Sequence, residues 1–213
     1  DELNKASLIE PLDSIGNPFE AGKIGMISIG MSNTTQEFST FVSLANSDPS
    51  MSSHMAIVDG AQGGYAANKW AENSYEVAPW SVLFSRLSDN GVDPNQVQVA
   101  WIKQGLPTTT TATYPLVLWP DFTQELRDDL RTIVQRLGQT YPNLRIIYLS
   151  SRIYAGYATT ILSPEPGAYE GAFAVRWLIQ EQMDGVLTDA PLLLWGPYLW
   201  ADGANGRNID DLV

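Results

Sequence analysis

Short polar or glycine-rich segments follow the first three apolar runs of the chain, and they hold the residues best suited to chemistry. Ser32 follows the first run, the segment Gly60–Gly64 follows the second, and Gln104 follows the third. A serine hydroxyl attacks an acyl carbon once a base takes its proton. Ser32 also precedes a predicted helix, whose N-terminus favours developing negative charge. These features make Ser32 the candidate nucleophile.

A second interpretation of Ser32 is that its hydroxyl merely caps the following helix, as many serines do. Asn33 and Thr34 are also available for capping, and Thr34 and Glu37 have the spacing of a capping box. Because other caps are at hand, we favour the nucleophile. The glycines could equally form a plain turn, and Gln104 could equally satisfy a loop carbonyl.

Apolar periodicity predicts the elements that position these residues. Runs rich in β-branched and other apolar residues predict five buried strands, at residues 23–30, 54–59, 97–102, 145–149 and 191–195. Helical spacing predicts helices after Thr34, at 80–87, from Asp121 as the cap to a C-cap glycine at Gly138, and at 173–183. Strands alternating with helices imply parallel pairing with right-handed crossovers. Sites in such sheets form beyond the carboxyl ends of the strands.

Composition and charge exclude several classes of protein. With 44% hydrophobic and 17% charged residues the chain is globular, and no apolar run approaches the ~20 residues of a membrane span. A formal net charge of −12 repels phosphate backbones, so nucleic acid is not an expected partner. The absence of cysteine excludes a disulfide framework, a thiolate nucleophile and a Cys-based zinc site.

Three successive blocks resemble those of the SGNH hydrolases, a superfamily of GDSL-like lipases and acylhydrolases. Gly30-Met31-Ser32 resembles the GDS block, with Met31 where that family usually has Asp. The turn from Asp59 resembles the glycine block, whose last glycine corresponds to Gly64, and Gln104 stands where the family usually has Asn. The resemblance runs from about residue 23 to about residue 200 and implies a flavodoxin-like, three-layer α/β/α fold with a five-stranded parallel sheet.

This resemblance also implies a function. The chain would be a serine ester hydrolase, acting through an acyl-enzyme on Ser32 on a carbohydrate O-acetyl ester or a small acyl ester. The backbone N–H groups of Ser32 and Gly64 and the side-chain amide of Gln104 would form the oxyanion hole, where one donor contributes ~3–4 kcal/mol. No metal or organic cofactor is required. Tyr65, Tyr114 and Glu170 are the candidates for contact with substrate.

A base for Ser32 is missing from the sequence. In SGNH hydrolases the base comes from an Asp-x-x-His block near the C-terminus, but the single histidine, His54, begins the second strand. It therefore lies at the opposite edge of the sheet, ~17–20 Å away. We hypothesise that the acid and base lie beyond Val213, which leaves the domain at 23–213 C-terminally incomplete behind an N-terminal arm at 1–22.

Other acidic and aromatic residues near predicted strand ends have plain interpretations. We expect Glu165, Glu170, Asp189 and Asp202 to be solvated surface charges, and the loop at 163–170 to lie over the site. Trp70 and Trp119 would suit sugar rings if they lie near the cleft.

Two further expectations concern location and an alternative function. No signal peptide is seen in this numbering, and we expect an exported protein, extracellular or periplasmic, whose signal was removed. The alternative function is a non-catalytic extracellular protein that binds glycan or builds a surface structure, because the base is missing and Met31 and Gln104 depart from the family pattern.

Overall fold

Five parallel strands form one sheet in the computed structural model, which describes residues 2–107, 119–159, 164–198 and 200–201. The strands are β1 (Ile24–Gly30), β2 (Met55–Val58), β3 (Val97–Lys103), β4 (Ile146–Ser150) and β5 (Leu192–Trp195), in the order β2-β1-β3-β4-β5. Every pair of neighbours is parallel. Tyr114 and Asp202 lie outside the described residues.

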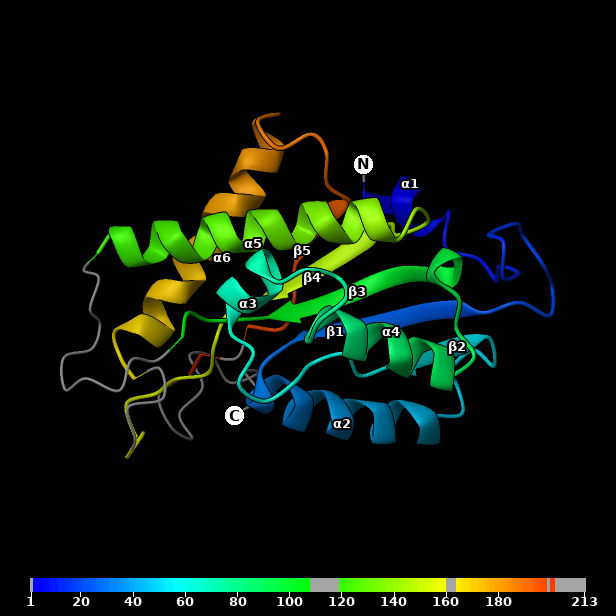
Figure 1. The fold of residues 1–213 in the computed structure, drawn as a ribbon, viewed down its shortest axis with the longest axis horizontal. Helices are drawn as coiled ribbons and strands as arrows, with labels where there is room; N and C mark the ends of the chain where they lie inside the picture. The colour runs from blue at the N-terminus through cyan, green and yellow to red at the C-terminus, as the bar shows by residue number, and fades with distance from the viewer. Residues whose placement is uncertain (1, 108–118, 160–163, 199, 202–213) are drawn as a thin grey trace.

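Helices cover the sheet on both faces (Figure 1). They are α1 (Glu2–Ala6), α2 (Ser32–Ser47), α3 (Ala67–Glu72), α4 (Trp80–Asp89), α5 (Asp121–Thr140) and α6 (Gly167–Met183). Successive strand residues point to opposite faces. Trp101 of β3 stacks on Phe38 of α2 with ring centroids 5.7 Å apart, whereas Ile102 joins the core shared with α3, α4, α5 and α6. The predicted three-layer α/β/α class with a five-stranded parallel sheet is confirmed.

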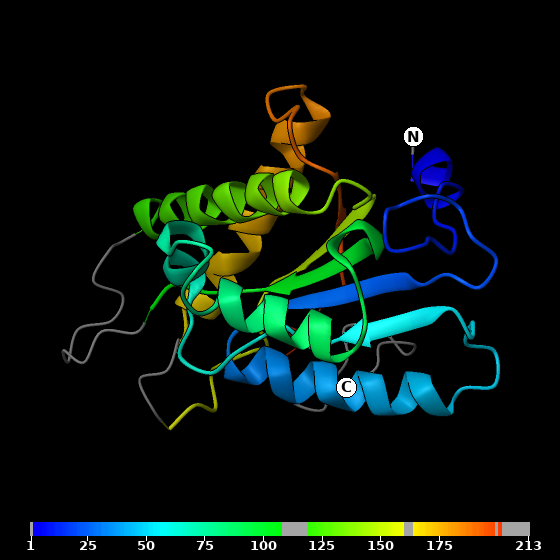
Figure 2. The same ribbon diagram turned by 45° about the vertical axis from the view of Figure 1, so that its right-hand side comes forward.

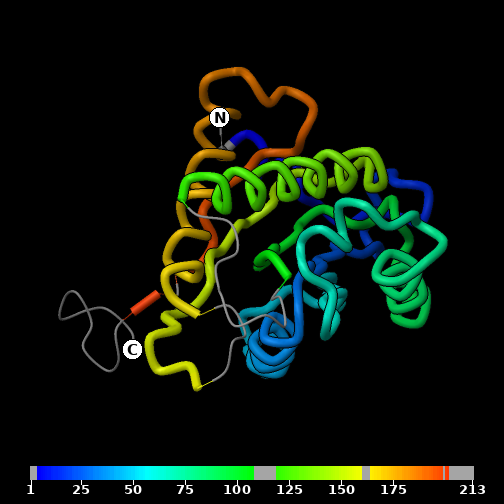
Figure 3. Tube along the Cα trace, turned by 60° about the vertical axis from the view of Figure 1, so that its left-hand side comes forward, coloured from blue at the N-terminus to red at the C-terminus, as the bar shows by residue number. Residues whose placement is uncertain are grey.

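The helices of the second face are joined by ionic and aromatic contacts. Trp70 of α3 and Trp80 of α4 are fully buried and meet edge to face at 5.1 Å, so Trp70 is a core residue and the idea that it serves a sugar cleft is wrong. Arg131 of α5 binds Glu181 of α6 at 2.6 Å where these helices cross (Figure 3). Within the described chain, no helix is long and apolar enough to cross a bilayer.

The N-terminal arm packs against the amino ends of the central strands (Figure 2). Leu12 is buried, bridges to Lys23, and its carbonyl accepts a hydrogen bond from the Gln96 side chain at 2.7 Å. Gln98 of β3 exchanges two hydrogen bonds with the backbone of Glu10. Buried polar groups in stable folds are paired in this way, so the arm satisfies glutamines that the sheet leaves open at this edge.

Several helix ends differ from the predictions. Helix α2 begins at Ser32, so Thr34 lies inside the helix, and its buried hydroxyl donates to the Lys103 carbonyl rather than forming a capping box. Asp121 is the first residue of α5 and makes no cap, because Pro120 takes that position. Gly138 lies within α5, where a Cβ would come within 3.0 Å of Pro191 Cδ, so it serves close packing and not a C-cap.

Candidate active site

The first predicted block forms a tight turn between β1 and α2. Met31 is extended, and Ser32 is the exposed first residue of the 16-residue helix. The turn needs glycine at position 30, since a Cβ there would lie 2.2 Å from Thr34 Oγ1. No hydrogen bond to Ser32 Oγ occurs among the described residues. Ser32 is therefore an exposed residue at the positive end of a helix dipole.

The glycine block of β2 lies directly beside Ser32. A Cβ on Gly63 would be 3.5 Å from Ser32 Cβ, and Gln62 N–H donates to Gly30 O at 3.0 Å. Gly64 has φ +83, a left-handed conformation that side chains disfavour, and its Cβ position faces open space. Glycine is thus required at 64 by backbone conformation and not by crowding.

The third predicted residue, Gln104, directly follows β3 at the carboxyl edge of the sheet. It is 4% exposed, and its Nε2 donates to Tyr65 O at 3.4 Å, while its Oε1 is buried with no partner. Ala67 N–H donates to Gly105 O at 3.0 Å, which joins the same two segments. The structure therefore brings Ser32, Gly64 and Gln104 to one edge, and their roles as oxyanion donors stay predictions.

Met31, which stands where the SGNH family usually has Asp, reaches across the edge of the sheet. Its Cε would lie 3.4 Å from a Cβ on Gly105, and Arg152 Cδ would lie 3.2 Å from the same point. Gly105 therefore leaves room for one side chain from just after β1 and one from beyond β4. The methionine contributes an apolar contact here and no charge.

A polar network that the sequence analysis missed holds the glycine block in place. Ser28 of β1 donates to Asp59 Oδ1 and accepts from Gly60 N–H at 3.0 Å. Arg86 of α4 donates to the carbonyls of Asp59 and Ala61 at 2.8 and 2.9 Å. The signal available was a serine inside an apolar run, with an aspartate closing the next. The network limits the movement of the turn that carries Gly64.

A partly buried ion pair joins the helix of Ser32 to β3, and the sequence analysis missed this pair too. The Lys103 ammonium, at the end of β3, binds the Glu37 carboxylate of α2, and the Lys103 side chain is fully buried. Burial lowers the pKa of Lys103 from its ordinary value, and the hydrogen bond and charge of Glu37 oppose that shift. The pair couples the helix of Ser32 to the strand of Gln104.

Two of the predicted surface carboxylates are not solvated. Glu165 accepts hydrogen bonds from Ala155 N–H and Trp200 Nε1 at 2.9 Å, and from Tyr169 N–H at 3.0 Å. Glu170, in the first turn of α6, is 8% exposed with a buried, unpartnered Oε2. Burial, and then the charge of Glu165, raises the pKa of Glu170. The predicted loop at 163–170 is in part helix, because α6 begins at Gly167.

The other predicted candidates are spread over the molecule. Asp189 lies before β5, where Gln135 binds it at 3.0 Å, so it is not at the carboxyl edge. Tyr65 is half-buried against the core. Trp119 is 49% exposed and packs on Phe173 and Trp177.

His54 lies at the amino edge, as predicted, with Nδ1 3.2 Å from Gly22 O. It cannot serve Ser32 as a base. Within the part of the chain that the structure describes, no group of three His, Cys, Asp or Glu side chains is arranged to hold a metal ion.

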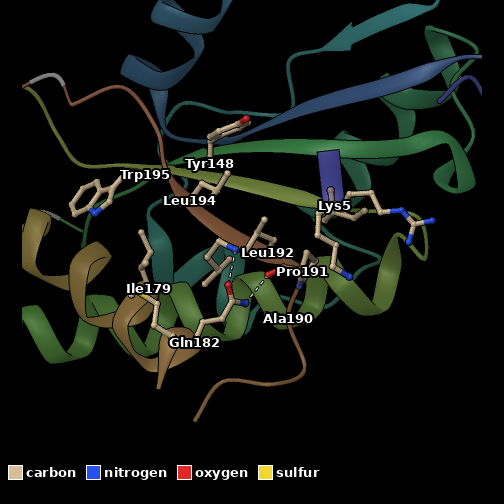
Figure 4. Close-up of a pocket in the computed structure, with 13 residues that line it drawn as sticks. Lys5, Tyr148, Ile179, Gln182, Ala190, Pro191, Leu192, Leu194 and Trp195 are labelled. Atoms are coloured by element: carbon tan, nitrogen blue, oxygen red, sulfur yellow. Dashed lines mark hydrogen bonds between the residues drawn. The ribbon is translucent and has the colours of Figure 1, made fainter. Parts of the chain in front are cut away.

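A hollow of about 770 Å³ lies away from these residues, along the edge strand β5 (Figure 4). Tyr148, Leu192, Leu194 and Lys5 line it, and Ser32, Gly64 and Gln104 do not. At its floor, the Gln182 side chain donates to Pro191 O and accepts from Leu193 N–H, each at 2.8 Å. This side chain satisfies backbone groups at the open edge of the sheet.

Two solved proteins are similar to the chain in structure. One, a gut microbial diltiazem-metabolizing enzyme, is 14% identical with a TM-score of 0.48, and the match covers 84% of this chain and 37% of that one. The other, a carbohydrate esterase, is 13% identical with a TM-score of 0.38, with coverage of 84% and 58%. No protein-family model and no curated protein matches the chain.

Both TM-scores lie below 0.5, so the site rests on the residues of this chain alone. The segments that hold Ser32, Gly64 and Gln104 follow β1, β2 and β3, in that order. They meet at the carboxyl edge of the sheet, as the sequence resemblance implies. The five-stranded parallel sheet in the order β2-β1-β3-β4-β5 is the arrangement that the sequence resemblance predicts. The chain spans about a third and about three fifths of the lengths of the two solved proteins.

Proposed function

We propose that the protein is a serine ester hydrolase with Ser32 as nucleophile. One observation carries this proposal: an exposed serine begins a 16-residue helix at the carboxyl edge, in contact with the glycine turn of β2. The buried Gln104 amide lies at the same edge, and its Nε2 makes one long hydrogen bond, to Tyr65 O, among the described residues, which leaves a second N–H to donate. A structural capping role does not explain Ser32, because Met31 occupies the N-cap position and no side chain caps the helix.

The reaction divides into two steps. Ser32 Oγ forms a bond to the ester carbon as its proton passes to a base, and the bond from that carbon to the alcohol oxygen breaks as the alcohol takes a proton. Water then releases the acid from the acyl-serine by the reverse proton transfers. The helix N-terminus, the Gly64 N–H and the second Nε2 hydrogen of Gln104 are the groups suited to stabilise the oxyanion. The proposal assigns no base, since His54 lies at the far edge.

The substrate class that we propose is a neutral acyl ester, either an O-acetylated carbohydrate or a small ester. A net charge of −12 disfavours anionic substrates. Tyr65, beside Gly64, and Glu170, at the start of α6, are proposed to contact the alcohol part, and Tyr114 stays a candidate on sequence grounds. We also propose that the protein acts outside the cell or in the periplasm.

Turnover of p-nitrophenyl acetate by the full-length protein tests this function. Ser32→Ala should remove the activity, because the acyl-enzyme cannot form. Ser39→Ala is the matched control, since Ser39 is an exposed serine of the same helix whose hydroxyl donates to the local Gln36 carbonyl. Equal turnover by Ser32→Ala and the wild-type protein would refute the proposal.

A binding role without chemistry is the second candidate, and one observation favours it. The sequence holds a single histidine, which lies at the amino edge, so no imidazole among these residues reaches Ser32. Calorimetric titration with acetylated xylan separates the two roles. Equal binding by wild type and Ser32→Ala, with no acetate released by either, would establish the binding role.

A further inference from the structure

Lys103 holds helix α2 at two points. Its backbone carbonyl accepts a hydrogen bond from Thr34 Oγ1 at 2.8 Å, and its ammonium binds the Glu37 carboxylate. Thr34 and Glu37 lie two and five residues after Ser32. Lys103 is also the residue immediately before Gln104. A single residue therefore joins the helix of the nucleophile to the strand end of the proposed oxyanion donor.

A buried ammonium is a costly way to join a helix to a strand. Moving an ion out of water costs several kcal/mol, and apolar residues of similar volume often replace a buried pair without loss of stability. The pair is also incompletely satisfied, because Glu37 Oε2 is buried with no partner. Phe38 of α2 already stacks on Trp101 of β3 beside it. Stability alone therefore gives little reason for an ion pair at this point.

We propose that Lys103 is a positioning residue, which sets the place of Ser32 relative to Gln104 by clamping the first two turns of α2. The inference rests on the proposed function. An apolar contact such as Phe38 on Trp101 is non-directional and lets a helix slide, whereas a hydrogen-bonded pair fixes one arrangement. Misplacement by about 1 Å costs ~10²-fold in rate, so the clamp acts on catalysis without touching substrate.

Rates of fluorophosphonate labelling, measured beside thermal unfolding, test the clamp. Lys103→Met should label ~100-fold more slowly. Glu37→Gln should lower the unfolding midpoint most, because it leaves the ammonium buried and unpaired. The double variant Lys103→Met/Glu37→Gln should recover that midpoint and still label slowly. A double variant that labels at the wild-type rate would overturn the proposal.

Arg131→Met is the matched control. Arg131 and Glu181 also form a partly buried pair between two elements, but they join α5 to α6, away from Ser32. Its loss should lower the unfolding midpoint and leave the labelling rate unchanged. A control variant that slows labelling as much as Lys103→Met would show that general loss of stability is responsible, and would overturn the positioning role.

Amide hydrogen exchange keeps this inference separate from the function on which it rests. Lys103→Met should raise exchange in the first turns of α2 by about tenfold, as expected for the loss of a charged hydrogen bond, and leave α5 unchanged. If the wild-type protein is not labelled, the proposed function fails and exchange alone decides the role of the clamp. Unchanged protection of α2 would then overturn it.

If Lys103→Met does not fold, hydrogen exchange and labelling can be measured on Thr34→Val instead. This change removes one hydrogen bond to Lys103 O and keeps the shape of the side chain. Exchange in the first turns of α2 should rise by roughly 3–10-fold, in line with one neutral hydrogen bond. No change in either exchange or labelling would overturn the proposal.

Discussion

Strand β3 has a buried glutamine near each end, and the two side chains are used differently. At the amino end, Gln98 Oε1 accepts from Glu10 N–H at 3.1 Å and its Nε2 donates to Glu10 O at 2.8 Å. Just beyond the carboxyl end, Gln104 makes one long contact with Tyr65 O and leaves Oε1 unpaired. The two residues are of the same type and are both buried, but they differ in how many of their side-chain hydrogen bonds are formed.

We infer that this difference separates a structural edge from the edge proposed to be reactive. An unpaired buried polar group costs ~1–3 kcal/mol, so folds keep few of them. Gln98 secures the N-terminal arm, and both its oxygen and its nitrogen have a partner. Gln104 keeps hydrogen-bonding capacity beside Ser32, where a ligand can use it. Gln62 shows that position alone does not decide this, because it lies at the carboxyl edge and its Nε2 donates to both Gly60 O and Pro79 O.

The largest effect is expected from Gln104→Leu. Loss of one oxyanion donor should slow fluorophosphonate labelling of Ser32 by ~10²–10³-fold, equivalent to ~3–4 kcal/mol in the barrier. Stability in urea should change by less than about 1 kcal/mol, since the side chain makes a single long hydrogen bond. A variant with wild-type labelling would remove Gln104 from the site and end the contrast between the two glutamines.

Gln98→Leu should lower the stability and leave the labelling of Ser32 unchanged, the reverse of Gln104→Leu. It leaves the N–H and C=O of Glu10 without partners, which should cost ~2–3 kcal/mol in the free energy of unfolding by urea. The labelling rate of the folded protein should stay at the wild-type value, because the change is at the far edge of the sheet. Slow labelling by this variant would show that the two edges are coupled.

Asp129 of α5 also has a buried polar atom without a partner, and it lies away from the proposed site. Changing it tests whether such an atom affects Ser32 from a distance. Asp129 Oδ2 is buried with no partner, and burial, followed by the charge of Glu125, raises the pKa of Asp129 to about 7. The unfolded value is about 3.9, so the folded state binds the proton more tightly and stability falls as the pH rises from about 4 to about 7.

Asp129→Asn should therefore flatten the dependence of stability on pH between about 4 and 7. Above pH 7 it should raise the unfolding midpoint by about 2–4 °C, a modest gain because solvent screens a half-exposed group. Calorimetry across this pH range measures both effects. Labelling of Ser32 should not change, and a slowed reaction would connect α5 to the site.

The smallest effect is expected at the edge strand. Gln182→Leu frees Pro191 O and Leu193 N–H at the edge of β5, and water can replace the lost bonds. The cost should stay below about 1 kcal/mol. An uncovered edge pairs with other chains, so sedimentation should show self-association that grows with concentration. A strictly monomeric variant would show that the glutamine does not protect the edge.

Much of the fold could be predicted from local sequence pattern. The strand runs at 23–30 and 97–102 contain β-branched residues between polar or glycine boundaries, and the structure places β1 and β3 there within one residue. The stripe of Phe122, Leu126, Leu130 and Leu137 predicted α5, and all four are buried. Helices α1 and α3 were missed because five and six residues are too few to show a period.

The site was predicted only in part, because its supports join residues far apart in the chain. Ser32, Gly64 and Gln104 follow strand ends, and parallel topology predicts their shared edge. Lys103 and Glu37 are 66 residues apart, and neither side chain has a local pattern that predicts the other. The solvation predicted for Glu165 is wrong for the same reason, since its three donors come from separate segments.

Peptide mapping after fluorophosphonate treatment of the full-length protein tests the central claim most directly. The account predicts one adduct per chain, located on Ser32, which is lost in Ser32→Ala and kept in Ser39→Ala. An unlabelled chain, or an adduct that persists in Ser32→Ala, would contradict it.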